Sequence, residues 1–386
     1  MKILFLSENY FPNVSGVPVV VRYLAEGLCK SGHAVTIATS CYQGAPREEI
    51  IDGVNVRRFD LHKSHLDLYS GEKENYIKFV LGFRCDAVIM ECLQCATTDL
   101  ILPYLSGIKA KKILHSHGLS GIDLKPFERK VDLLHSVSNT WHWMHAQWYY
   151  RIFVPQHIKS IDTVLCLSEV DNTIAYFEKN NIRARILPNA VEDSFLQDSR
   201  SNTQPDVAGI GKPYFLSVAY YSQIKNQLGI LEEYYKTAIT DHAMVFIGPS
   251  KNDYYNKVIA ANIEFEKKYG KRSVLFLTNI DRAFIPDIIG NAKLYLVGST
   301  IEQFSIAMIE TMAKGVPFVS TNVGNARMLP GGLVVDDIAE MSEKIKMLLY
   351  NNELYQTLST NGRQYVRRHC IHSKVVRQLA EIIESN

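Results

Sequence analysis

Residues 294–324 of the chain read LYLVGSTIEQFSIAMIETMAKGVPFVSTNVG, and this stretch decides the fold. The apolar run at 294–297 predicts a strand. Ser305 is a good N-cap for a helix with apolar side chains at helical spacing, and Gly315 suits the left-handed cap that ends one. Residues 318–321 predict the next strand. Strand, helix and strand in this order are typical of a parallel α/β sheet, in which ligands bind beyond the carboxyl ends of the strands.

Two carboxylates frame the start of this helix. Glu302 lies in the loop before it, and Glu310 lies inside it. The open N–H groups and the dipole at Ser305 and Ile306 suit an anionic phosphate. A helix carboxylate such as Glu310 can accept two hydrogen bonds from a vicinal diol, as in ribose. The alternatives are a surface charge for Glu302 and, for Glu310, a solvated carboxylate paired with Lys314.

The composition is that of a globular protein. A chain of 386 residues with 47% apolar residues predicts two domains, each with its own core. The formal charge is +2 and the charges are spread along the chain, so we expect no nucleic-acid partner. The seven cysteines are odd in number and scattered, which favours a reducing cytoplasm. No apolar run reaches the length of a membrane span, and the apolar start is too short for a signal peptide.

The first half of the chain opens like a Rossmann domain. Residues 3–6 and 34–38 predict two strands, separated by a loop at 9–18 and a helix. Further strands are predicted at 54–59, 86–90, 113–114, 163–168 and 185–187, and in the second half at 214–219, 245–248, 274–277 and 333–335. Residues 61–73 are a polar loop without a predicted element, and residues 193–212 indicate a linker.

A pair of histidines, His115 and His117, follows the strand that begins at Ile113. A histidine at the end of a parallel strand lies where ligands bind, and its ordinary pKa is close to neutrality. The alternative is a core histidine that is hydrogen-bonded to the backbone. Two histidines at this spacing also raise the question of a metal. No carboxylate or cysteine accompanies them at ligand spacing in the sequence, so we expect no metal.

Residues 139–155 contain all three tryptophans and form an aromatic segment. A helix here would place one set of side chains on one face: Trp141, Met144, Trp148 and Ile152. Trp143, Tyr150 and Arg151 would point elsewhere. Because aromatic rings favour interfaces with one wet side, we predict that these last three contact an acceptor or a membrane surface.

The alternative for this segment is a core helix that Pro155 stops. Basic residues nearby could add attraction to anionic lipid: Lys109, Lys111, Lys112, Lys125, Arg129 and Lys130.

The stretch at 294–324 resembles the family-4 retaining glycosyltransferases (glycosyl transferases group 1). It contains their E-x7-E element from Glu302 to Glu310, the E-x-F-x around Phe304, the G-x-P after the helix, and Gly324. The resemblance extends along the chain through G-H-A-V at 32–35, L-P-N-A-V at 187–191 and the loop at 220–227, in which Lys225 takes the position of the family lysine. The chain departs from the pattern at Ser15, Ala190, Asn226 and Thr278, which replace glycines, and at Tyr220, which replaces an arginine.

The resemblance implies an α/β protein of the GT-B fold, with two Rossmann-like parallel-sheet domains facing an interdomain cleft. We expect an N-terminal acceptor domain at 1–195 and a C-terminal nucleotide-sugar donor domain at 196–364. A last helix at 365–386 is expected to pack back on the first domain.

The resemblance also assigns roles to residues. It implies that Glu310 holds the ribose diol, and that Glu302 and the N–H groups of Phe304 and Ser305 hold the donor sugar. Lys225 and the helix start at Ile306 would neutralise the diphosphate. Gly16 would let the backbone approach the donor phosphates, unless it is a plain turn glycine. Asn279 and Ile280 would lie by the base. His117 would touch the donor sugar, so that His117 and Glu302 are the expected catalytic residues.

The activity implied is retaining transfer of a hexose or N-acetylhexosamine from a nucleotide-sugar, with a UDP-sugar expected, and without a metal or other cofactor. The acceptor would be a glycan or a lipid-linked (polyprenyl-linked) sugar of a bacterial surface polysaccharide, O-antigen or capsule. The enzyme would be cytoplasmic, at the inner face of the cell membrane through a peripheral contact. Alternatives are a sugar-nucleotide epimerase, a phosphorylase, and a catalytically impaired nucleotide-sugar-binding protein, which Tyr220 keeps open.

Overall fold

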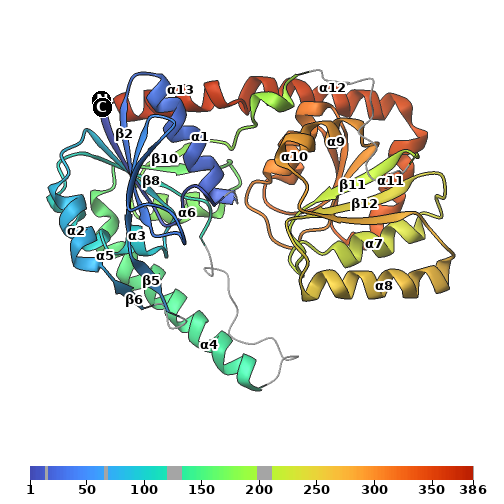
Figure 1. The fold of residues 1–386 in the computed structure, drawn as a ribbon, viewed down its shortest axis with the longest axis horizontal. Coiled ribbons are helices and arrows are strands. Elements are labelled where there is room, and N and C mark those ends of the chain that lie inside the picture. The colour runs from blue at the N-terminus through green and yellow to red at the C-terminus, as the bar shows by residue number, and fades with distance from the viewer. Residues whose placement is uncertain (14–15, 65–67, 120–132, 198–210, 386) are drawn as a thin grey trace. The chain divides into compact units, whose positions relative to one another are not determined.

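The computed structural model of the chain contains two compact units (Figure 1). Unit 1 comprises residues 1–188 and 373–386, and unit 2 comprises residues 189–372. The structure describes all residues except 14–15, 65–67, 120–132, 198–210 and 386, and it describes no side chain of 133–139. Three sequence-based expectations therefore lie outside the described residues: Ser15, part of the predicted linker, and the basic residues Lys125, Arg129 and Lys130.

The sheet of unit 1 has eight strands in the order β10-β9-β8-β7-β1-β2-β4-β3. All neighbours are parallel except β3, which is antiparallel to β4. The strands are β1 (Lys2–Ser7), β2 (Ala34–Ser40), β3 (Glu48–Ile51), β4 (Val54–Phe59), β7 (Ala87–Glu91), β8 (Lys111–His115), β9 (Thr163–Cys166) and β10 (Ala184–Ile186). The central strand β1 is buried from Ile3 to Ser7, because a parallel sheet is covered on both faces. The strands predicted for this half are all present.

The other elements of unit 1 surround this sheet. They are the hairpin β5 (Leu61–Lys63) and β6 (Tyr69–Gly71); the helices α1 (Gly16–Lys30), α2 (Lys73–Gly82), α3 (Ala96–Asp99), α4 (Leu133–Trp148), α5 (Val154–His157), α6 (Asn172–Lys179) and α13 (His372–Glu384); the π-helix η2 (Tyr149–Phe153); and the 3₁₀ helices η1 (Leu102–Gly107) and η3 (Ile158–Ser160). The hairpin β5-β6 lies in the segment that we expected to be a loop, and β3 was not predicted. Both are short strands whose polar side chains hide the alternation of a strand.

Unit 2 is built on six parallel strands in the order β13-β12-β11-β14-β15-β16. The strands are β11 (Tyr214–Val218), β12 (Ala243–Gly248), β13 (Val274–Thr278), β14 (Leu294–Val297), β15 (Phe318–Thr321) and β16 (Gly332–Val335). The helices are α7 (Gln227–Lys236), α8 (Asp253–Tyr269), α9 (Ile285–Asn291), α10 (Ile306–Lys314), α11 (Met341–Tyr350) and α12 (Asn352–His369), with 3₁₀ helices η4 (Asp193–Phe195), η5 (Arg282–Phe284), η6 (Ala326–Met328) and η7 (Ile338–Glu340). Figure 1 shows α7 and α8 on one face of the sheet and α9 and α10 on the other. This is the doubly wound arrangement that the sequence predicts.

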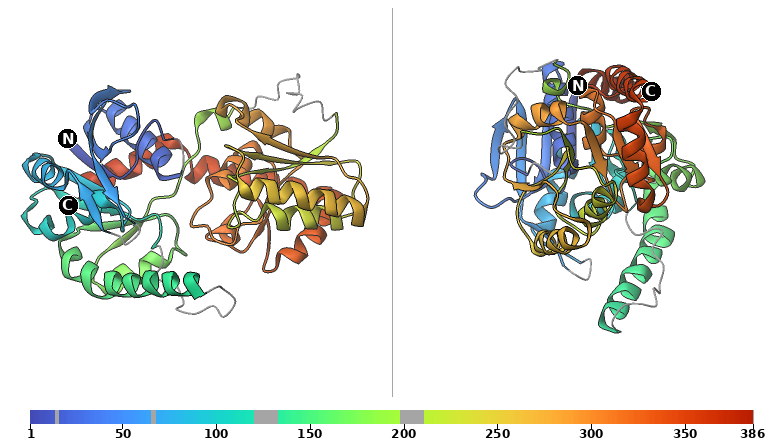
Figure 2. Two further views of the ribbon diagram at one scale, coloured as in Figure 1. Left: turned by 60° about the horizontal axis from the view of Figure 1, so that its bottom comes forward. Right: turned by 90° about the vertical axis from the view of Figure 1, so that its right-hand side faces the viewer.

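The aromatic segment forms one continuous helical stretch, α4-η2-α5, and Figure 2 shows the first turns of α4 projecting beyond the body of unit 1. Pro155 does not stop the helix. Proline has no N–H, so Pro155 cannot donate a hydrogen bond to the carbonyl of Arg151, four residues earlier. Arg151 lies in the π turn Tyr149–Phe153, and this wider turn accommodates the proline ring. Of the helices in the described part of the chain, none combines the length and the apolar character of a membrane span.

The faces of this helix differ from the prediction. Tyr150, a predicted contact residue, is 3% exposed and packs in the core, whereas Trp143 is half-buried and Arg151 is exposed. The exposed residues form an apolar stripe, which we call the aromatic stripe: Trp141, Met144, Trp148 and Ile152, each 47–54% exposed. The predicted contact of Tyr150 is therefore wrong, because the helix buries the side that contains Tyr149 and Tyr150, whereas the contacts of Trp143 and Arg151 stay predictions.

The unit boundaries at 188 and 372 differ from the expected 195 and 364. Residues after 188 belong to unit 2 because they bond to it: Asn189 Nδ2 donates to the Phe304 carbonyl at 3.2 Å, and Lys314 Nζ donates to the Ser194 carbonyl at 3.2 Å. The expected last helix is two helices. α12 is tied to unit 2 through Ser359 Oγ, which donates to the Gly315 carbonyl at 2.6 Å.

The second of these helices, α13, completes unit 1. Gln378 Nε2 donates to the Ile186 carbonyl at 2.7 Å, and Lys111 Nζ donates to the Ile382 carbonyl at 2.6 Å. Its apolar residues are buried in unit 1, among them Val375, Leu379 and Ile383. The chain therefore returns to its first unit for its last turns.

Leu379→Ala should destabilise unit 1 by about 2–5 kcal/mol, because a fully buried leucine leaves a cavity when it is truncated. All three tryptophans belong to unit 1, so their fluorescence during urea unfolding measures the stability of this unit. The matched control is Arg377→Ala, an exposed position on the same helix. Equal unfolding midpoints for the two variants would contradict the assignment of α13 to unit 1.

Candidate functional site

The candidate site in unit 2 lies where the strand order reverses. β11 has β12 on one side and β14 on the other, so the loops that follow β11 and β14 leave the sheet in neighbouring positions. In open parallel sheets this position forms a crevice for ligands. The Thr300 N–H donates to the Ile224 carbonyl at 2.8 Å, which joins the two loops. The predicted residues Lys225 and Glu302 belong to these loops.

The start of α10 is capped and closely packed. Ser305 is the N-cap, and its Oγ accepts from the Met308 N–H at 3.4 Å. Phe304 and Ser305 are buried, and Ile306 is half-buried. Gly324 has φ +50°, and a Cβ there would lie 2.4 Å from the Gln303 carbonyl oxygen, so only glycine fits against this loop. The loop before the helix therefore has a path fixed by backbone contacts.

Glu302 is held in a network of side chains. Lys225 Nζ forms an ion pair with Glu302 Oε1, and Ser299 Oγ donates to the same oxygen at 2.9 Å. The side chains of Lys225 and Glu302 are 19% and 15% exposed. The structure thus brings a predicted phosphate ligand and a predicted catalytic carboxylate into direct contact.

Glu310 is buried and is paired with an arginine from another loop. The Arg282 guanidinium contacts Glu310 Oε1 and also Glu192 Oε1, the latter at 3.1 Å. Burial raises the pKa of the Glu310 carboxyl, and Arg282 offsets part of this rise. Burial lowers the pKa of Arg282, but the carboxylates of Glu310 and Glu192 outweigh it and raise the pKa, so the guanidinium stays protonated. Lys314 donates to the carbonyls of Ser194 and Gln197, at 3.2 and 3.0 Å.

The remaining predicted donor residues of unit 2 line neighbouring strand ends. Asn279 and Ile280 follow β13, and Asn279 has φ +59°. Asn279 is exposed and Ile280 is half-buried. Tyr220 is 51% exposed, and its ring centroid lies 5.7 Å from Lys225 Nζ. The tyrosine that replaces the family arginine therefore lies beside the lysine of the same loop.

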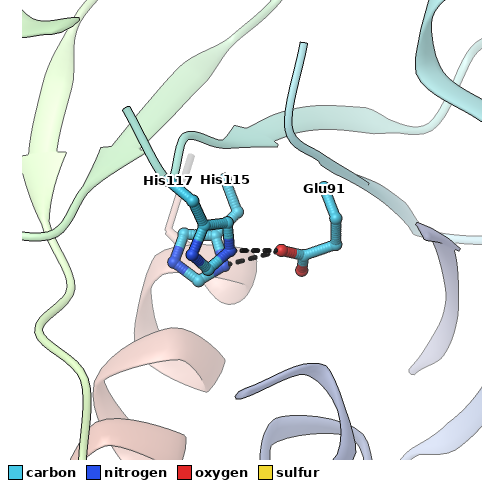
Figure 3. Close-up of side chains that lie close together, drawn as sticks. All are labelled: Glu91, His115 and His117. Atoms are coloured by element: carbon cyan, nitrogen blue, oxygen red, sulfur yellow. Dashed lines mark hydrogen bonds and ion pairs between the residues drawn. The ribbon is translucent and has the colours of Figure 1, made fainter. Parts of the chain in front are cut away.

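Two predicted residues belong to unit 1. Gly16 begins α1 with φ +37°, and a Cβ there would meet no atom within 4 Å, so the space beside it is open. His117 follows β8, and its Nε2 lies 2.8 Å from Glu91 Oε2 at the end of β7 (Figure 3). His115 Nδ1 lies 3.0 Å from the same oxygen. The expectation that no carboxylate accompanies the histidine pair is therefore wrong.

Sequence reasoning missed Arg282 and Glu91. Arg282 lies in a turn without periodicity, and the one signal was its place after a predicted strand, next to Asn279 and Ile280. Glu91 directly follows the buried strand predicted at 86–90, and a charge in that position was the signal. The contacts of Arg282 with Glu310 and of Glu91 with His117 could not be inferred from the sequence. Each depends on how segments that are distant in the chain are placed by strand pairing or by the path of a loop.

The comparisons with known proteins agree with this geometry. Residues 14–195 match the family described as Glycosyltransferase Family 4, and residues 212–351 match the family described as Glycosyl transferases group 1. The alpha-monoglucosyldiacylglycerol synthase of Streptococcus pneumoniae is 22% identical over an alignment of 345 residues, which covers 83% of this chain and 71% of that protein.

Solved structures show the same fold. Sucrose-phosphate synthase from Thermosynechococcus elongatus superposes with a TM-score of 0.74 at 15% identity, over 99% of this chain and 98% of that one. Anabaena HepE in complex with UDP and glucose superposes with a TM-score of 0.72 at 14% identity, over 100% of both chains. The fold is GT-B. With matches to both halves of such an enzyme in the expected order, the chain belongs to the family-4 glycosyltransferases.

Proposed function

We propose that this protein is a retaining, metal-independent glycosyltransferase that moves a hexose or an N-acetylhexosamine from a UDP-sugar to a glycan or lipid-linked acceptor of a bacterial surface polysaccharide. The observation that carries the proposal is the start of α10, where a capped helix N-terminus lies between two carboxylates, Glu302 and Glu310. A nucleotide-sugar offers a diphosphate for the helix start and hydroxyl groups for the carboxylates.

The electrostatics of unit 2 support transfer of the sugar from a diphosphate. Negative charge develops on the diphosphate as the sugar leaves, and fixed positive groups stabilise that charge most when they are already in place. In the proposal, Lys225 and the N–H groups of Ser305 and Ile306 supply this positive charge. Glu302 keeps Lys225 in place before the donor binds. Glu310 accepts the ribose hydroxyls, with Arg282 as the group that holds its carboxylate in position.

The acceptor side of the proposal rests on the aromatic stripe of α4 and η2. Two tryptophans, a methionine and an isoleucine expose apolar surface along one helix face, and Arg151 is exposed in the same turn as Ile152. Amphipathic helices with tryptophan on the apolar face bind at the surface of bilayers. The relative in Streptococcus pneumoniae is named for a glucosyldiacylglycerol product. We therefore propose a peripheral contact with the membrane, at its cytoplasmic face.

Product analysis with UDP-sugars tests the reaction class. A glycosyltransferase should form a new glycoside only when an acceptor is added, and the anomeric configuration should be retained without added metal. Release of an epimerised free sugar without acceptor would indicate the epimerase. UDP binding without any product from any sugar donor and acceptor would indicate a binding protein, and absence of UDP binding would overturn the proposal.

Glu310→Ala should weaken the binding of UDP by about tenfold or more, because a hydrogen bond to a charged group contributes about 1.5–3 kcal/mol. Isothermal titration calorimetry with UDP measures this change. The matched control is Glu233→Ala, which removes another buried carboxylate of unit 2 that pairs with Lys236. Unchanged UDP affinity in Glu310→Ala would refute the ribose assignment, and an equal loss in both variants would point to a general effect on folding.

Tyr220→Arg should strengthen UDP binding at low ionic strength, because it adds a cation beside Lys225 where the family has one. The gain should shrink as salt is added, since exposed charges are screened. Tyr350→Arg adds the same charge at another exposed tyrosine of unit 2 and should have no such effect. If both variants bind UDP like the wild type, the diphosphate does not approach Tyr220.

Replacing Trp141 and Trp148 together with alanine should lower co-sedimentation with phosphatidylglycerol vesicles severalfold and leave UDP affinity and thermal stability near the wild type. The control replaces Tyr42 and Tyr104, which are also exposed aromatic residues of unit 1. Binding that persists in the tryptophan variant but disappears in high salt would indicate a basic patch as the membrane contact instead.

A further inference from the structure

A buried carboxylate lies between the two histidines of unit 1. Glu91 and His115 are paired across the parallel strands β7 and β8, so their side chains share one face of the sheet. His117 lies two residues further along the chain, and its ring centroid is 4.2 Å from that of His115. Figure 3 shows both rings directed at the Glu91 carboxylate. Glu91 and His115 are each 1% exposed.

The hydrogen bonding of this cluster is unequal. His117 Nε2 has hydrogen-bond geometry to Glu91 Oε2 at 2.8 Å, whereas His115 Nδ1 is close to the same oxygen but not aligned with it. The second carboxylate oxygen, Oε1, has no hydrogen-bond partner among the described residues. A buried carboxylate is costly unless it is paired, so its main hydrogen bond to His117 is a strong constraint on that ring.

The charge states follow from the surroundings. Burial alone would raise the pKa of Glu91, but the two histidines outweigh it and lower the pKa to about 2. Burial and the neighbouring His115 lower the pKa of His117, although Glu91 and Asp171 act in the opposite direction. At neutral pH the carboxylate is therefore ionised and His117 is neutral. An ionised carboxylate can only accept a hydrogen bond, so the proton of His117 must lie on Nε2.

We propose that Glu91 is a positioning residue that fixes His117 as its Nε2–H tautomer and so presents Nδ1 as a hydrogen-bond acceptor for a sugar hydroxyl group. The inference rests on the proposed function and on the role that the family resemblance implies for His117, which is contact with the donor sugar. A fixed tautomer of His117 would contribute to the specificity for the donor sugar. A site with a fixed acceptor favours a hydroxyl group in that position and disfavours a sugar that lacks it, because the acceptor would then remain unpaired.

The same three residues also have the spacing of metal ligands, since their ligand atoms all lie within 4.8 Å of one another. The two explanations make opposite demands on His117. A metal would bind the ring nitrogen that faces Glu91, and that nitrogen must then carry no proton. The hydrogen bond requires that it does carry one. The protonation state of Nε2 therefore separates them.

Nuclear magnetic resonance of protein with ¹⁵N-labelled histidine rings tests the proposal without any substrate. In the full chain at neutral pH, the His117 signal, assigned by its loss in His117→Ala, should show a proton on Nε2 and none on Nδ1. In Glu91→Gln the preference should be lost, because an amide can donate as well as accept. A proton on Nδ1 in the wild type, or an unchanged signal in Glu91→Gln, would overturn the proposal. So would stoichiometric zinc binding that Glu91→Gln abolishes.

Kinetics supply the second readout. With an active UDP-sugar, Glu91→Gln should lower kcat by about tenfold or more, as in other enzymes whose carboxylate orients a histidine. UDP affinity should stay the same, and in a His117→Ala background Glu91→Gln should have no further effect. The matched control is Asp99→Asn, a buried carboxylate of unit 1 that accepts from the Tyr69 hydroxyl at 2.6 Å. Additive losses in the double variant would contradict the proposal, and if no UDP-sugar is turned over, the resonance experiment still decides the role of Glu91.

Discussion

The site in unit 2 depends on charge balance at the start of α10. A helix N-terminus has an effective charge of about half a positive unit, which two ionised carboxylates beside it would more than cancel. Each carboxylate is instead paired with a cation from a different loop: Glu302 with Lys225 and Glu310 with Arg282. These pairs connect the ends of β11, β13 and β14, so the position of each loop depends on the charges of its neighbours.

Backbone contacts complete this constraint. Gly324 approaches the carbonyl of Gln303 so closely that a side chain would displace the loop that contains Glu302. A Cβ at Gly298 would likewise lie only 2.7 Å from Cγ1 of Ile230 in α7. The E-x7-E spacing fixes the carboxylates along the chain, but the glycines fix where the loop lies. A substitution at either glycine would therefore move Glu302 away from Lys225 without removing any charged group.

The sequence predicted the parallel strands of both sheets and the helix start at Ser305, because buried parallel strands are short apolar runs and because an N-cap and a C-cap glycine are local signals. It did not predict the partners of the charged residues. Arg282 reaches Glu310 from the loop after β13, and Glu91 meets His117 through the pairing of β7 with β8. Such contacts depend on sheet register and loop paths, which cannot be predicted from composition and periodicity. The aromatic helix shows the same limit in one element: the period was correct, but the π turn and the packing of Tyr149 and Tyr150 decided which face is buried.

The pairing of Lys225 with Glu302 has a consequence for the proposed reaction. A diphosphate that binds at the helix start must compete with Glu302 for Lys225. The arginine that the family has in this loop would provide a second cation for the diphosphate, but this chain has Tyr220 in its place. Glu302, once relieved of part of its cation, has an oxygen free to accept from the donor sugar. Binding of the diphosphate and binding of the sugar are then linked through one lysine, so a free nucleotide and a complete nucleotide-sugar place Glu302 in different environments. In the proposed reaction, discrimination between donors would then follow from a competition between two anions for Lys225, and the residue at position 220 would set how strongly the phosphate competes.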